Sequence, residues 1–122
     1  MRLVQVAQHA DDLDRAAGFY SELLGVEPTA VFDPPGLLFF DLDGVRLMLE
    51  RGAPPSILYL HVEDVRAALK RLGERADVVT PPHVIFTHEN GVLGPAGHDE
   101  WQVFIKDSEG NTVGLVSFEP KD

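Results

Sequence analysis

An internal repeat constrains this chain most, because a duplicated unit limits the fold to two copies of one small structure. The segment VAQHADDL at residues 6–13 aligns without a gap on LYLHVEDV at 58–65, an offset of 52 residues. Further on, FFDLDGVRLML at 39–49 aligns on IKDSEGNTVGL at 105–115, an offset of 66 residues. The second copy is therefore longer, and the Gly-rich polar segment 89–100 is the natural place for its extra residues.

Each copy has the pattern of a strand, a helix and three further strands, which predicts an α+β fold of two tandem βαβββ modules. The first helix begins after Asp11 or Asp12, has apolar residues at helical spacing as far as Leu24, and ends at Gly25. We expect one domain over 1–122, with modules at 1–50 and 57–122 joined by a linker at 51–56. Predicted strands cover residues 3–8, 29–32, 37–41, 45–50, 57–62, 83–88, 101–106 and 112–118, and the second helix covers 63–75.

The strands have two chemically different faces, since successive side chains of a strand alternate. One face is almost wholly aliphatic, as at Leu47, Leu49, Val113 and Leu115, and is expected to pack under the helices. The opposite face, which we call the mixed face, lines either a ligand cavity or water. Its side chains are our candidate ligand contacts: Gln5, Ala7, His9, Arg46, Met48, Glu50, Ile57, Tyr59, His61, Thr112 and Gly114.

Trp101 opens a strand directly after the polar segment. It is either a packing residue or a stacking wall for a planar ligand, and we add it to the candidate ligand contacts.

The composition excludes several classes of function. The chain has 122 residues and no cysteine, so disulfides, thiolate zinc sites and cysteine nucleophiles are excluded. A net charge of −10 disfavours nucleic acid and suits a cationic or neutral small molecule, although it also serves solubility alone. No apolar run approaches the ~20 residues that cross a bilayer, and the start lacks the apolar core of a signal peptide. We expect a cytoplasmic protein that binds neither membrane nor nucleic acid.

Three segments resemble the vicinal oxygen chelate superfamily, which includes glyoxalases, bleomycin-resistance proteins and extradiol dioxygenases. They are DDLDRAAGFYSELLGVEP at 11–28, HVEDVRAAL at 61–69 and WQVFIKDSEGNTVGLV at 101–116, where Ser108 replaces the usual proline. The resemblance implies an open, curved mixed sheet around a cavity, with helices on the outer face, and a homodimer. It is specific for the fold rather than the activity, because this fold hosts many chemistries.

In metal-dependent members of this superfamily, the first and last strands of each module supply the metal ligands. Carried over residue by residue, these positions are Gln5, Met48, Ile57 and Gly114. Only Gln5 has a side chain suited to a hard divalent ion, so no metal and no other cofactor is predicted. A glycine in the middle of a strand weakens it, and we expect the missing side chain of Gly114 to leave room for a ligand.

The resemblance leaves more than one function open. The leading hypothesis is a metal-independent small-molecule-binding protein of the bleomycin-resistance-like kind, with a cationic or neutral aromatic ligand. The alternative is a lyase, isomerase, epimerase or dioxygenase. It would use a divalent metal at an atypical site of Gln5, Glu50 and His61, or acid–base chemistry by His61, His9 or Glu50. A third hypothesis is a structural or regulatory module without a ligand.

His9 and His61 also have a simpler interpretation. Both lie at predicted strand ends before helices, where an imidazole either contacts a ligand or hydrogen-bonds the backbone of the turn.

Overall fold

A computed structural model describes residues 1–122, and the chain divides into two compact units. The first unit comprises Met1–Ser56 together with Asp107–Asn111, and the second comprises Ile57–Lys106 and Thr112–Asp122. The boundary after Ser56 falls at the end of the predicted linker. The turn 107–111, which lies between two strands of the second unit in sequence, was not expected to belong to the first unit.

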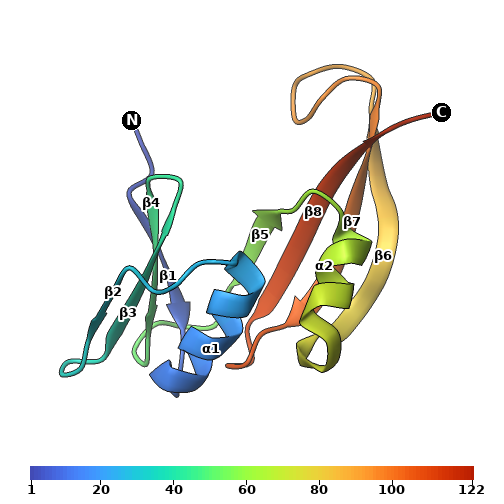
Figure 1. Cartoon of the computed structure of the whole chain (residues 1–122). Helices are drawn as coiled ribbons and strands as arrows, with labels where there is room; N and C mark the ends of the chain where they lie inside the picture. Colours follow the sequence, from blue (N-terminus) through green and yellow to red (C-terminus); the bar gives the residue numbers. More distant parts are fainter. The chain divides into compact units, whose positions relative to one another are not determined.

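The first unit is one βαβββ module with a four-stranded mixed sheet in the order β1-β4-β3-β2 (Figure 1). β1 pairs in parallel with β4, whereas β3 pairs antiparallel with both β4 and β2. Its elements are β1 (Gln5–His9), α1 (Leu13–Leu24), β2 (Ala30–Phe32), β3 (Leu37–Leu42) and β4 (Val45–Glu50).

α1 begins and ends where its capping residues predicted. The Asp12 side chain accepts a hydrogen bond from the backbone nitrogen of Arg15 at 3.0 Å, which satisfies one free donor of the first turn. Gly25 has the left-handed φ of 72° that ends a helix without a Cβ clash, and its N–H donates to the Ser21 carbonyl. The buried residues of the helix are Leu13, Ala16, Phe19, Tyr20 and Leu23.

The second unit repeats the arrangement, with sheet order β5-β8-β7-β6 and a parallel β5–β8 pair. Two βαβββ modules, each with a four-stranded mixed sheet, confirm the predicted fold class. The elements are β5 (Ile57–His61), α2 (Val65–Leu72), the 3-10 helix η1 (Gly73–Arg75), β6 (Asp77–His88), β7 (His98–Lys106) and β8 (Thr112–Pro120). Neither helix is long and apolar enough to span a bilayer.

β6 begins at Asp77, six residues before the predicted start of this strand at 83. Pro81 and Pro82 are unfavourable in a regular strand, because proline cannot donate a ladder hydrogen bond. β6 is an edge strand, and shifts of register on both sides of Thr80 and after Val84 accommodate the irregular stretch. β7 likewise begins at His98 rather than at 101, so the connecting loop is 89–97.

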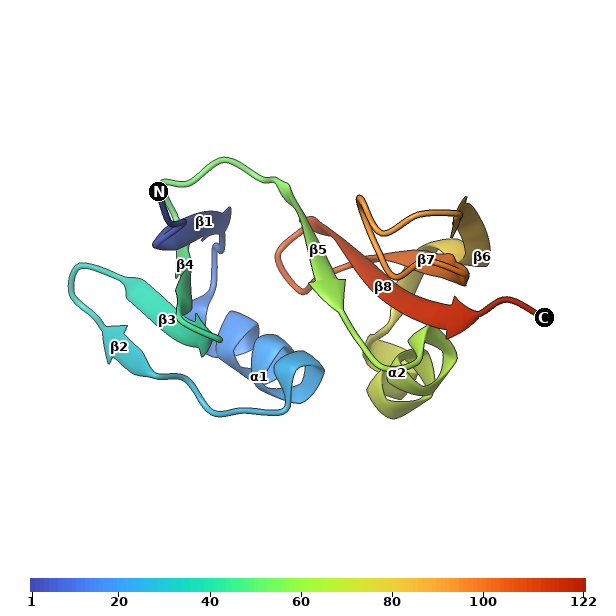
Figure 2. The ribbon, with the colours of Figure 1, turned by 90° about the horizontal axis from the view of Figure 1, so that it is seen from above.

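The predicted alternation of faces is confirmed by burial. Leu47 and Leu49 of β4 and Val113 and Leu115 of β8 are fully buried, whereas Tyr59 on the mixed face is 58% exposed. α1 contacts β3 and β4, and α2 contacts β7 and β8, each helix covering one face of its own sheet (Figure 2).

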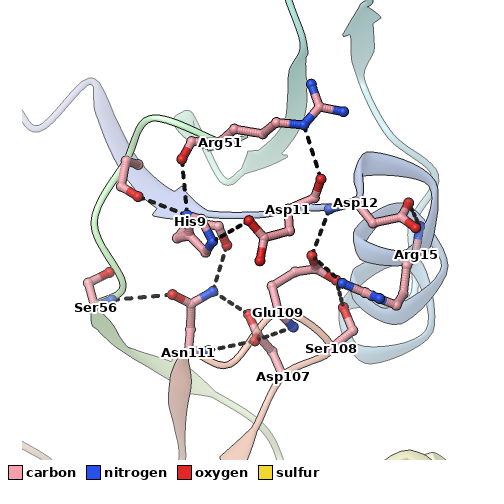
Figure 3. Close-up of polar contacts among 11 residues, drawn as sticks. His9, Asp11, Asp12, Arg15, Arg51, Ser56, Asp107, Ser108, Glu109 and Asn111 are labelled. Carbon is pink, nitrogen blue, oxygen red and sulfur yellow. Dashed lines mark hydrogen bonds and ion pairs between the residues drawn. The ribbon is translucent and has the colours of Figure 1, made fainter.

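The turn 107–111 is the polar centre of the first unit (Figure 3). Asp107 Oδ1 accepts the backbone N–H groups of Glu109 and Asn111, both at 2.8 Å. Its Oδ2 accepts the Tyr20 hydroxyl at 2.5 Å and the Asn111 amide at 2.7 Å. The same amide donates to the His9 carbonyl at 2.7 Å. This turn therefore ties the core of α1 to the end of β1.

Candidate functional site

On the first unit, the parallel register of β1 and β4 aligns the candidate residues in pairs. Gln5 lies opposite Arg46, Ala7 opposite Met48, and His9 opposite Glu50. Arg46 Nε donates to Gln5 Oε1 at 3.0 Å, and Gln5 Nε2 lies 3.7 Å from the sulfur of Met48. The amide of Gln5 is therefore engaged by its neighbours at both ends.

The imidazole of His9 hydrogen-bonds the backbone of the linker 51–56 (Figure 3). Its Nδ1 donates to the carbonyls of Arg51 and Ala53 at 3.1 and 3.0 Å, and its Nε2 lies 3.0 Å from Asp11. The hydrogen bond to Asp11 raises the pKa of His9, with the two carbonyls adding to it against the cost of burial. The imidazole thus bonds backbone, as one of its two interpretations had it, but the backbone of the linker 51–56 rather than of the turn before α1.

The residues at the metal-ligand positions do not fit a metal ion of the family type. Gln5 and Met48 contact each other, Ile57 is aliphatic, and Gly114 has no side chain. No group of three or more His, Asp or Glu side chains has a metal-holding arrangement. In the atypical set, the β1–β4 register separates Gln5 and Glu50 by four residues, about 13 Å along the strands.

Gly114 of β8 lies between Tyr59 of β5 and Phe104 of β7 in the sheet register. The two rings meet edge to face over it, with centroids 5.8 Å apart and planes at 84°. A Cβ atom at Gly114 would lie 2.9 Å from Tyr59 Cδ2 and 3.0 Å from Phe104 Cε1. The expectation that the missing side chain leaves empty room is therefore wrong, because aromatic side chains of both neighbouring strands cover the glycine.

Gly114→Leu should destabilise the protein by about 1–2 kcal/mol in urea unfolding, since the new side chain must displace two rings. The Tyr59→Ala change in the same chain should recover part of that loss, because it removes the closer ring. Equal unfolding free energies of Gly114→Leu and the unchanged protein would contradict this packing.

The mixed face of the second unit is more aromatic than the sequence indicated. Besides Tyr59, it carries Phe104 and Phe118, neither of which was among the candidate ligand contacts. The ring of His61 stacks on Phe118 at 5.8 Å with 27° between the planes. The sequence could have placed Phe104 on the mixed face, because it alternates with Val103 and Ile105, whose aliphatic side chains are fully buried under the helix.

Ile57 and Thr112 lie opposite each other at one end of this face. Ile57 is 55% exposed, and the Thr112 hydroxyl accepts a hydrogen bond from Lys106 Nζ at 3.0 Å. Because the Thr112 hydroxyl keeps its own proton to donate, both residues remain candidate ligand contacts beside Tyr59.

Trp101, the remaining candidate ligand contact, does not lie on the mixed face. It has the parity of Val103 and Ile105 in β7, so it points toward α2. The guanidinium carbon of Arg66 lies 4.0 Å from its ring centroid, a cation–π contact. Trp101 instead lines a shallow groove with Arg66, Asp99, Glu119 and the last three residues.

A histidine–carboxylate pair on the mixed face was also missed. His88 of β6 is 2% exposed, and its Nε2 lies 2.8 Å from Glu100 Oε1 of β7. The only sequence signal was a spacing of two residues, which puts residues 86 and 88 on one face of β6 and residues 100, 102 and 104 on one face of β7.

Comparison with known proteins agrees with this architecture. The model of the Glyoxalase/Bleomycin resistance protein/Dioxygenase superfamily matches residues 2–115. No curated protein gives a significant match.

Solved structures of the same fold include lactoylglutathione lyase from Agrobacterium tumefaciens, with 22% identity, a TM-score of 0.67, and coverage of 95% of this chain and 92% of that one. TioX from Micromonospora sp. ML1 has 20% identity and a TM-score of 0.69, covering 98% of this chain and 100% of its own. A superfamily member from Sphaerobacter thermophilus has 20% identity and a TM-score of 0.71, covering 96% and 97%. At these identities the likeness concerns the fold alone.

Proposed function

Since the chain belongs to the Glyoxalase/Bleomycin resistance protein/Dioxygenase superfamily, we propose that it is a small-molecule-binding protein that needs no metal ion. The ligand, a cationic or neutral aromatic molecule, binds against the mixed face of the second unit. The observation that carries this proposal is the exposed Tyr59 ring, which packs on the half-buried Phe104 over Gly114.

The side chains at this position suit an aromatic ligand. Tyr59 is 58% exposed although it packs edge to face on Phe104, so one side of its ring is free to stack. Ile57 extends the apolar surface along β5, and His61 adds a polar group at the other end of the same strand. A ligand on this row would bury apolar area while keeping one hydrogen-bonding partner.

The charge of the chain supports the cationic class of ligand. With a net charge of −10, long-range attraction favours a positively charged molecule over an anionic one. The donor atoms at the family's metal positions support the metal-independent part of the proposal, because they comprise one amide, one thioether and no carboxylate or imidazole.

The candidate contacts of the first unit form a separate surface, which the ligand proposed here does not use. They are Gln5, Ala7, Arg46, Met48 and Glu50, which share the mixed face of β1 and β4. The homodimer and the cytoplasmic location stay predictions from the sequence and its resemblance.

The binding proposal predicts that a planar aromatic cation such as proflavine binds and that Tyr59→Ala weakens it at least ten-fold, about 1.4 kcal/mol, measured by fluorescence titration. Binding should be unchanged by a metal chelator and weaker for an anionic aromatic dye.

The matched control is Phe32→Ala. Phe32 is 52% exposed and forms a similar edge-to-face pair with Phe39, at 6.0 Å and 79°, on the first unit. Loss of affinity in the Phe32 variant but not in the Tyr59 variant would reject the proposed surface, as would a chelator that abolishes binding.

A further inference from the structure

The His88–Glu100 pair has the geometry of an oriented base. Glu100 Oε1 lies 2.8 Å from His88 Nε2, and its Oε2 accepts a hydrogen bond from Gln102 Nε2 at 2.6 Å. An ionised carboxylate only accepts, so in the neutral imidazole Nε2 carries the proton and Nδ1 keeps a lone pair. Nδ1 has no hydrogen-bond partner in the structure, which leaves it able to take up a proton.

Aromatic side chains surround this pair. The His88 ring meets Phe86 at 4.8 Å and 75°, and Phe118 at 5.7 Å and 63°. Phe118 in turn stacks on His61. His88, Glu100 and Gln102 therefore form a polar row within an apolar surface. This row lies on the same face as Tyr59 and Phe104.

Loop 89–97 covers the imidazole. A Cβ atom at Gly94 would lie 2.8 Å from both Cε1 and Nε2 of His88 and 2.9 Å from Cε1 of Phe118. The loop is anchored where it ends, because Gly97 N–H donates to the His88 carbonyl at 2.8 Å. Its tip is exposed, with Val92 and Leu93 at 79% and 80%. Only a residue without a side chain allows the loop to lie this close to the histidine.

We propose that His88 and Glu100 form a loop-covered acid–base site for small, planar, conjugated weak carbon acids. The inference deepens the proposed function, since the ligand uses the same mixed face of the second unit. When loop 89–97 opens, a C–H bond of the ligand breaks, its proton passes to His88 Nδ1, and the electron pair delocalises into the conjugated system. Glu100 stays ionised and stabilises the imidazolium, which then returns the proton to the ligand or to water. No co-reactant is required.

The test of the chemistry uses 5-nitrobenzisoxazole, a planar aromatic carbon acid. Removal of its C–H proton by a base breaks the N–O bond and leaves the electron pair on a coloured phenolate, so a single proton transfer is read directly. We expect the protein to exceed free imidazole at equal concentration, and His88→Gln to lower the rate about 100-fold. Glu100→Gln should lower it about ten-fold, because the imidazolium loses its charge partner.

The control for this experiment is His83→Gln, a histidine of the same strand whose Nδ1 contacts the Pro81 carbonyl. It should keep the full rate. A His88→Gln protein that is as fast as the unchanged one, or an unchanged protein no faster than imidazole, would overturn the acid–base site. Because His88→Gln leaves Tyr59 and Phe104 in place, proflavine binding in that variant separates failure of this site from failure of the binding surface.

The cover is tested with two loop variants that differ in one contact. Gly94→Ala places a methyl group against His88, whereas the Cβ of Gly91→Ala would meet only the Gly94 carbonyl, at 4.0 Å. Hydrogen–deuterium exchange at the imidazole C2 position, followed by mass spectrometry, measures how accessible His88 is. We expect about ten-fold faster exchange at His88 in Gly94→Ala and no change in Gly91→Ala. Equal exchange in both variants would show that the loop does not cover the base.

Discussion

Asp107→Ala should lower the free energy of unfolding by about 4 kcal/mol, a large part of the stability of a small domain. The Asp107 carboxylate accepts four hydrogen bonds, from two backbone N–H groups, the Tyr20 hydroxyl and the Asn111 amide. Truncation leaves these donors buried without a partner, which costs more than the bonds themselves contribute. Burial, with the charge of Asp107, raises the pKa of Tyr20, so its hydroxyl stays a donor throughout the neutral range. Urea unfolding at neutral pH measures the loss.

Two milder variants check that the loss arises from these donors. Tyr20→Phe removes one of the four and should cost about 1 kcal/mol. Asp107→Asn keeps the shape of the side chain and one acceptor oxygen, so its effect should fall between those of Tyr20→Phe and Asp107→Ala. An Asp107→Ala protein within 1 kcal/mol of the unchanged one would mean that the turn 107–111 does not hold the first unit together.

The second large effect concerns Glu109, which makes the free energy of unfolding depend on pH. Its carboxylate is fully buried and accepts Arg15 Nε at 2.7 Å, Arg15 Nη2 at 3.0 Å and the Asp12 N–H at 2.9 Å. Burial alone would raise its pKa, but Arg15, the Asp12 N–H and the Ser108 hydroxyl outweigh burial and lower the pKa to about 2. The folded value thus lies below the ordinary value of 4.5.

A depressed pKa means that the unfolded chain binds the proton more readily than the folded one. The stabilisation by Glu109 is therefore present in full above about pH 4.5 and is lost as the pH falls toward about 2. Glu109→Gln should lower the free energy of unfolding by about 2 kcal/mol at pH 7. The loss is smaller than for a fully buried ion pair because Arg15 is 53% exposed. The same change should also reduce the loss of stability between pH 4.5 and about pH 2, the acid limb of the stability curve. Glu27→Gln, at an exposed position, serves as the control and should leave both unchanged. An acid limb with the same slope in Glu109→Gln would assign that slope to other carboxylates.

Local patterns in the sequence were enough for the architecture. The two copies of the repeat, the Asp12 and Gly25 caps, and the two-residue alternation of β4 and β8 all depend on residues near one another in the chain. Each pattern reflects a local constraint, such as a free helix donor or the pleat of a strand. Their agreement is why the fold class could be predicted although no solved structure cited above exceeds 22% identity.

The candidate site was predicted less well, because its decisive contacts join distant residues. His9 bonds carbonyls more than 40 residues away, and the turn 107–111 bonds residues about 90 to 100 positions earlier. For Trp101 the sequence left packing and ligand stacking open, since it did not show where β7 begins or which of its faces α2 covers. The pairing of His88 with Glu100 depended on the irregular β6–β7 register, which no periodicity in the sequence encodes.

Gly114 shows the division most clearly. The resemblance, together with the repeat alignment, identified it as a strand glycine in the position of a ligating side chain. Whether that position is empty depended on the rings of Tyr59 and Phe104, 55 positions before it and 10 before it in sequence. Backbone preferences act within a few residues, whereas the packing of side chains across a sheet is decided by which strands become neighbours. The sequence therefore determined the two modules and their faces. Only the tertiary structure decided which side chains cover Gly114 and which histidine lies within hydrogen-bond distance of a carboxylate.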